Sequence, residues 1–190
     1  NTHPGQGTAN RRFFFHNFML ELLWIENSDE VKSNLTRPIK LFERCNKFDT
    51  NISPFGIGLR PANEKNEKVL FPVWDYHPLY LPDFLKIQVA DGTPLSEPMF
   101  FYLSFADRQD KYPAEKKENM KHSLPLKEVT NIEVHINQKN EFSEAAKIIN
   151  NIDNLLLIKD NENYLKLTFD KGAYKKEKDF RPNIPLIINW

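Results

Sequence analysis

Residues 3–24 read HPGQGTANRRFFFHNFMLELLW, and the one acidic residue among them, Glu21, stands inside the apolar run FMLELLW. Alternate residues of a strand share a face, so Glu21 would lie with Met19 and Leu23, and both faces of this strand are otherwise apolar. Burying a bare carboxylate costs on the order of several kcal/mol unless it is paired or binds a metal ion. The stretch therefore predicts a strand that directs Glu21 into an enclosed space.

The same stretch predicts a β-hairpin. Residues 11–16 (RRFFFH) and 18–25 (FMLELLWI) have the composition of strands. His16 and Asn17 suit the tight turn between them, because asparagine tolerates the left-handed conformation. The fold around Glu21 is thus expected to begin with two antiparallel strands.

A glycine-lined strand is expected at residues 54–61 (PFGIGLRP), where apolar residues alternate with Gly56, Gly58 and Arg60. Two glycines on one face allow another group to approach the backbone closely. The other elements expected in this half are a helix at 37–46, strands at 84–90 and 98–105, and an aromatic, proline-punctuated loop at 71–82.

The composition narrows the class of protein. Lys and Arg total 26, as do Asp and Glu, so the net charge is zero, and a dedicated nucleic-acid partner is not expected. Cys45 is the single cysteine, which excludes an internal disulfide and fits a reduced, cytoplasmic setting. No run approaches the roughly 18 apolar residues of a membrane helix, and no signal peptide is visible.

The C-terminal half has its own pattern. Strands are expected at 130–136, 155–159, 163–169 and 184–189, with a helix near 143–152 after the first of them. The order is therefore strand–helix–strand–strand–strand, with a turn region at 170–180. Residues 106–128 are lysine-rich and lack an apolar period. We expect an N-terminal module at 1–105, a connection at 106–128 and a C-terminal module at 129–190.

Several of these segments resemble the glyoxalase-like branch of the vicinal oxygen chelate (glyoxalase/bleomycin resistance/dioxygenase) superfamily. The resemblance rests on HPGQGTAN with the hairpin ending in MLELLW, on SPFGIGLRPA and WDYHPLYLP, and on YLKLTFD and DFRPNIPLIINW near the C-terminus. It implies an α+β fold of paired βαβββ modules, whose curled mixed sheets surround a cavity that binds a ligand, often with a divalent metal ion. The order found for residues 129–190 agrees with one such module.

The sequence departs from this family in two ways. The family usually has a strand and a helix before the H-P-x-Q-G-T stretch, so the first module is expected to lack its opening strand and helix. MLELLW at 19–24 also aligns weakly with YLKLTF at 164–169, which matches Glu21 with Lys166. A second carboxylate ligand at that position is therefore absent.

Glu21 is the candidate catalytic residue, as a metal ligand or as a general base. The alternative is a salt bridge to Arg11, Arg12 or Arg60. The resemblance places His3, Gln6, Thr8 and Asn10 in a ligand-contacting loop. The alternative for this loop is a turn capped by its own side chains.

Other candidates lie further along the chain. Arg60 would hold an anionic group or pair with Glu21. An aromatic cluster would line the binding site or plug the core, and its members are Trp74, Tyr76, His77 and Tyr80. His135, which would serve as the opening-strand histidine of the second module, joins His3 and Glu21 as a candidate ligand of one divalent metal ion.

These observations predict a protein that binds a small molecule in a sheet-lined cavity, with metal-assisted lyase, isomerase or dioxygenase chemistry if it is an enzyme. The alternative is a non-catalytic small-molecule binding or sequestration protein of the same fold. A third alternative is assembly through an unpaired sheet edge, including a homodimer. A single sequence names no substrate.

Overall fold

The computed structural model describes residues 1–45, 51–62, 68–117 and 120–190. Within these residues the chain has a mixed α+β fold that is mostly β, with short helices and three sheets. The expected α+β class is confirmed. None of the described helices is long and apolar enough to cross a lipid bilayer.

The predicted hairpin forms, and a short strand extends it into a sheet that we name the hairpin sheet. Its antiparallel strands are β1 (Thr2–His3), β2 (Thr8–Phe14) and β3 (Met19–Ile25), in the order β1-β2-β3. Arg12 on β2 lies directly opposite Glu21 on β3. Because β3 is the last strand in this order, it is an edge of its sheet.

Short helices follow the hairpin. They are α1 (Ser28–Val31), a 3₁₀ helix (Arg37–Ile39) and α2 (Leu41–Arg44). The single helix predicted from residue 37 onward is wrong, because Lys40 has a positive φ of 57° and separates the 3₁₀ helix from α2. The last residue predicted for that helix, residue 46, lies outside the described residues.

A second sheet, the central sheet, has the strand order β4-β7-β6-β5. Strands β4 and β7 are parallel, and the other pairs are antiparallel. The bounds are β4 (Gly56–Leu59), β5 (Val73–Tyr76), β6 (Ile87–Ala90) and β7 (Met99–Tyr102). Strand β5 lies within the segment that we expected to be a loop.

The glycines of β4 make room for an aromatic ring. A Cβ placed on Gly58 would lie 2.7 Å from the ring of Phe101 on β7, and one on Gly56 would lie 3.3 Å from it. The close approach predicted for this strand face is thus the approach of a core side chain from within the same sheet, rather than of a ligand.

The C-terminal sheet has the strand order β11-β12-β10-β8-β9. Strands β8 and β9 are parallel, with α3 between them in the chain, as the expected strand–helix–strand order requires. Strand β11 was not predicted. The bounds are β8 (Val129–Asn137), α3 (Glu144–Ile149), β9 (Leu155–Asp160), β10 (Tyr164–Phe169), β11 (Glu177–Asp179) and β12 (Leu186–Asn189).

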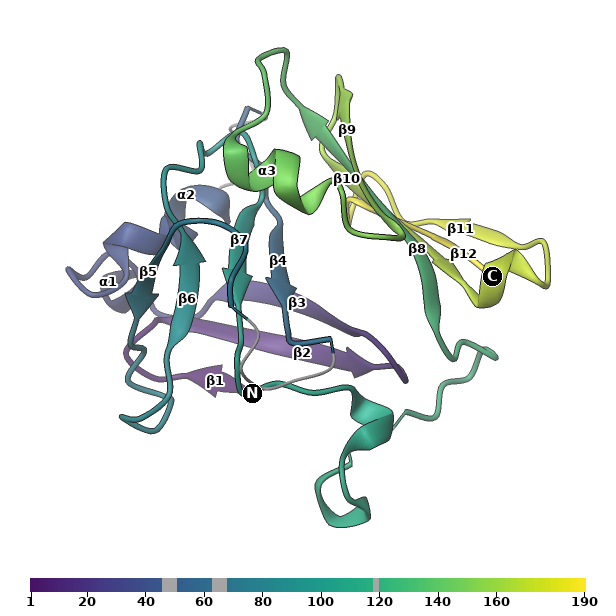
Figure 1. Ribbon diagram of the computed structural model, residues 1–190, viewed down its shortest axis with the longest axis horizontal. Helices are drawn as coiled ribbons and strands as arrows, with labels where there is room; N and C mark the ends of the chain where they lie inside the picture. The colour runs from purple at the N-terminus through teal and green to yellow at the C-terminus, as the bar shows by residue number, and fades with distance from the viewer. Residues whose placement is uncertain (46–50, 63–67, 118–119) are drawn as a thin grey trace.

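The central sheet is covered on both faces (Figure 1). On one face Phe100 packs in an apolar cluster with Ile149 of α3 and Val134 of β8. On the other face Val89 packs in a cluster with Leu23 of the hairpin sheet. The first cluster contains buried residues from both predicted modules, so these two parts of the chain share a core.

A buried carboxylate joins the two parts. Glu97, which is 0% exposed, accepts hydrogen bonds from the backbone N–H of Ser143 at 2.7 Å and from its hydroxyl at 2.5 Å. Ser143 is the N-cap of α3. The carbonyl of Glu97 also accepts a hydrogen bond from Arg44, and burial lowers the pKa of Arg44 to about 10.

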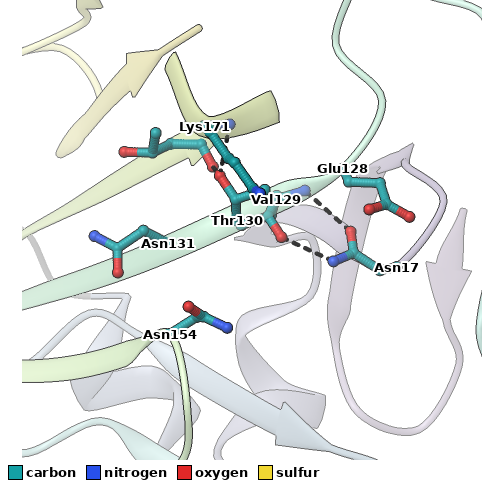
Figure 2. A pocket seen from close by; sticks show the side chains of 8 residues that line it. Asn17, Glu128, Val129, Thr130, Asn131, Asn154 and Lys171 are labelled. Carbon is teal, nitrogen blue, oxygen red and sulfur yellow. Dashed lines mark hydrogen bonds between the residues drawn. The ribbon is translucent and has the colours of Figure 1, made fainter. Parts of the chain in front are cut away.

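The hairpin turn makes a second connection. Asn17 is not in the left-handed conformation that we expected. Its side chain instead accepts a hydrogen bond from the N–H of Val129 at 3.0 Å and donates one to the carbonyl of Val129 at 2.8 Å, as the dashed lines in Figure 2 show. The amide therefore takes the place of a neighbouring strand at the start of β8.

Candidate functional site

Polar side chains from three segments meet beside the hairpin sheet, where they form a hydrogen-bonded and stacked group that we call the polar network. The segments are the β1–β2 turn region, β3, and β5 with the loop after it. Every member was among the candidates that the sequence analysis named. The members are His3, Gln6, Thr8, Asn10, Glu21, Tyr76 and Tyr80.

The buried part of the network runs from β5 to β2. The hydroxyl of Tyr76 donates to Gln6 Oε1 at 3.1 Å, and Gln6 Nε2 donates to Thr8 Oγ1 at 2.8 Å. Burial raises the pKa of Tyr76 to about 12, so its hydroxyl keeps its proton at neutral pH. Thr8 is 1% exposed. These contacts satisfy polar groups that would otherwise be costly to bury.

Asn10 joins this part to Glu21. Its Nδ2 lies 2.6 Å from Glu21 Oε1 and 3.2 Å from His3 Nε2, and an amide nitrogen has two hydrogens to donate. His3 Nε2 is then an acceptor, so the proton of the ring is on Nδ1, which donates to Thr8 Oγ1 at 2.9 Å. Burial lowers the pKa of His3, in agreement with this neutral ring.

Asn10 has one further polar atom. Its Oδ1 is buried and has no hydrogen-bond partner among the described residues. Glu21 is half-buried, and its Oε1 accepts a hydrogen bond from Asn10. A neutral amide therefore holds this oxygen of the carboxylate in place.

A loop after β5 covers the network. The ring of Tyr80 lies 4.6 Å from the ring of His3, centroid to centroid, and burial raises the pKa of Tyr80. A Cβ on Gly5 would lie 2.6 Å from the side chain of Leu79. Gly5 and Gly7 both have positive φ values, of 77° and 73°, which glycine adopts without strain. The glycines of HPGQGT thus allow the turn and the covering loop to pack together.

A hollow of about 370 Å³ opens beside Asn10. Its volume falls in the range of ligand sites, which begins at about 300 Å³. Two of its lining residues are arginines and two are aromatic. The lining consists of Asn1, Asn10, Arg11, Arg12, Phe14 and Trp24. Asn10 therefore belongs both to the network and to the wall of a space that a small molecule would fit.

Among the described residues, three predicted binding residues make no hydrogen bond to the network, although the ring of Trp74 packs edge-on against Tyr76. Arg60 donates to the carbonyls of Pro61 and Asn17 near the hairpin turn, and burial with the nearby Arg108 lowers its pKa. Trp74 packs in the apolar cluster between the hairpin and central sheets. His77 is exposed.

His135 lies on β8 of the C-terminal sheet, where its Nδ1 is 2.8 Å from Asp160 Oδ2. The candidate metal ligands His3 and Glu21 are thus together, linked through Asn10, whereas His135 has a different set of neighbours.

The structure brings together another group that the sequence did not suggest. Ligand atoms of His16, Asp110 and Glu128 lie within 4.8 Å of one another. Arg108 already donates to Asp110 at 2.6 Å and to Glu128 at 3.0 Å. The guanidinium supplies the positive charge that a metal ion would bring, so the group is explained as an ion-pair cluster.

Arg11 and Arg12 entered our sequence analysis only as partners of Glu21. Alternation on β2 places them on opposite faces, and no sequence signal indicates that both line one hollow. Comparison of the chain with protein-family models, with curated proteins and with solved structures finds no match in any of the three. The class that fold and site define is a mixed α+β protein with a partly buried polar network beside an open hollow.

Proposed function

We propose that this chain binds a small molecule in the hollow beside Asn10, with Asn10, Arg11 and Arg12 as polar lining. Glu21 and His3 lie behind Asn10 and hold its amide in place. The observation that carries the proposal is the position of the Asn10 amide, which holds both the carboxylate of Glu21 and the ring of His3. Preorganised polar groups beside aromatic side chains, here Phe14 and Trp24, are typical of ligand sites.

Nuclear magnetic resonance of the ¹⁵N-labelled chain tests this. The probes are phenylacetate, the neutral benzamide, and catechol. We expect at least one probe to shift the side-chain amide signal of Asn10. The Asn10→Ala substitution should lower the affinity of the chain for that probe by about tenfold or more. Asn151→Ala, on the exposed end of α3, is the control and should bind as the unchanged chain does. Absence of any shift at Asn10 with all three probes would contradict the proposal.

A second candidate is metal-assisted lyase, isomerase or dioxygenase chemistry, which the glyoxalase resemblance implies. It is favoured by one observation, that His3 Nε2 and Glu21 Oε1 both face the same atom of Asn10. A divalent ion that displaced this amide would have a nitrogen and a carboxylate ligand, and would polarise a substrate oxygen. Glu21→Gln should then abolish metal binding at this site, whereas unchanged metal content in that variant would reject the metal mechanism.

The paired βαβββ arrangement also stays a proposal. It is supported by the order strand–helix–strand–strand over Val129–Phe169, with β12 as the later strand of the module. A homodimer formed through a sheet edge is the remaining proposal, and the molar mass of the chain in solution tests it.

A further inference from the structure

The environment of His135 is unusual for a histidine on the outer face of a sheet. Its side chain is 12% exposed, and its ring stacks on Tyr164 with 3.9 Å between centroids and 12° between planes. Nδ1 lies 2.8 Å from Asp160 Oδ2. A carboxylate on Nδ1 fixes the proton there and leaves the lone pair on Nε2.

The other ring nitrogen lacks a partner. Nε2 is buried and has no hydrogen bond to any described residue. Glu133 Oε2 lies 3.6 Å from Nε2, which is too far for a hydrogen bond. Buried polar atoms are nearly always satisfied, so an unsatisfied one calls for a missing proton, water or ion.

We propose that His135 Nε2 and Glu133 Oε2 bind one divalent transition-metal ion of the Zn²⁺ type. Two ligand atoms that are each about 2.1 Å from a tetrahedral zinc ion lie about 3.4 Å apart. The observed separation of 3.6 Å is close to this value, so a small movement of the Glu133 side chain would complete the pair. Water would fill the other positions once the Glu133 side chain, which is 25% exposed, has moved and opened the buried Nε2.

Both ligands already have the outer contacts that metal sites use. Asp160 holds His135 through Nδ1, as carboxylates do for metal-bound histidines. The second oxygen of Glu133, Oε1, accepts a hydrogen bond from Asn131 at 2.9 Å, which leaves Oε2 directed at the histidine. The arrangement orients each donor atom before the ion arrives.

Two nearby cations have other partners. Lys166, which lies opposite Glu133 in the sheet, is 3.9 Å from Glu177, and Arg181 lies over the far face of Tyr164 and pairs with Asp179. In the ion-pair cluster, Arg108 lies between two carboxylates and neutralises them. Neither Lys166 nor Arg181 bridges His135 and Glu133 in this way. These two cations therefore do not neutralise the His135–Glu133 pair on β8.

Zinc titration of the chelator-treated chain, followed by competition with a fluorescent zinc indicator, tests the proposal. We expect one ion per chain, and at least tenfold weaker binding in His135→Gln and in Glu133→Gln. Asp160→Asn should weaken binding about 10- to 100-fold while it leaves both ligands in place. The exposed His77 gives the control His77→Gln, which should bind zinc as the unchanged chain does.

Nuclear magnetic resonance of the histidine ring nitrogens gives a second readout that does not depend on the buried variant folding. Zinc should shift Nε2 of His135 and leave its Nδ1 protonated. A proton on Nε2 that zinc does not displace would overturn the proposal in favour of an ion pair with Glu133. Zinc binding that is unchanged in Glu133→Gln would overturn it too. If zinc is lost in Glu21→Gln instead, the ion belongs to the polar network.

Discussion

At the scale of single residues, Asn10 organises the candidate site. Its amide nitrogen contacts both the ring of His3 and the carboxylate of Glu21. A carboxylate or a hydroxyl at this position would have too few hydrogens to donate to both. Asparagine at this position therefore favours the neutral form of the His3 ring.

The first prediction concerns pH. Because burial lowers the pKa of His3 below its ordinary value of about 6.5, the unfolded chain binds this proton more tightly than the folded chain. Stability should therefore fall as pH drops through about 6.5 toward the lowered value. Urea unfolding at several pH values gives the slope of the free energy of unfolding against pH, and His3→Gln should remove part of this slope. His77→Gln should keep the slope, and an unchanged slope in His3→Gln would contradict the assignment.

At the scale of elements, small residues decide how close the strands and loops pack. The β4 strand presents Gly56 and Gly58 to the ring of Phe101, and the β1–β2 turn presents Gly5 to Leu79. Alternation of apolar residues predicted β4, whereas β5 was missed because its aromatic and proline-flanked sequence has no clear period. Backbone hydrogen bonds to β6 hold β5 as a strand, and the sequence of β5 alone does not indicate them.

The second prediction compares the two glycines of β4. Gly58→Ala should lower the free energy of unfolding by about 1–3 kcal/mol, because the new methyl group overlaps a ring packed in the core. Gly56→Ala should cost less, since its nearest ring atom would be 3.3 Å away. Denaturant unfolding measures both. Phe101→Leu should lower the free energy of unfolding less in the Gly58→Ala variant than in the unchanged chain, because it removes the ring that the new methyl group overlaps. Equal losses in the two alanine variants would contradict this explanation.

At the scale of the whole molecule, buried polar contacts join parts that are far apart in the sequence. Glu97 contacts the N-cap of α3, and Asn17 contacts Val129 across 112 positions. Both contacts satisfy backbone groups that an apolar core alone would leave unpaired. Together with the shared apolar cluster around Phe100, they make the two expected modules depend on one another.

The third prediction tests this dependence. Asn17→Ala should lower the free energy of unfolding by about 1–3 kcal/mol, because it leaves the N–H and C=O of Val129 without their partner. Amide hydrogen exchange at Val129 should become faster. Asn151→Ala removes an exposed side-chain contact at the end of α3 and should change neither quantity. Normal protection of Val129 in Asn17→Ala would show that the contact is dispensable.

The sequence by itself determined the hairpin and the α+β class, because strand alternation acts over a few residues. The family resemblance, rather than the hairpin, grouped His3, Gln6, Thr8 and Asn10 as candidate site residues. Only the tertiary structure showed that Tyr76 contacts Gln6 and Tyr80 contacts His3, moved Arg60 away from the network, and left His135 Nε2 unsatisfied beside Glu133. These outcomes depend on how separate sheets pack and on which buried polar atoms find partners, and neither is encoded in local periodicity.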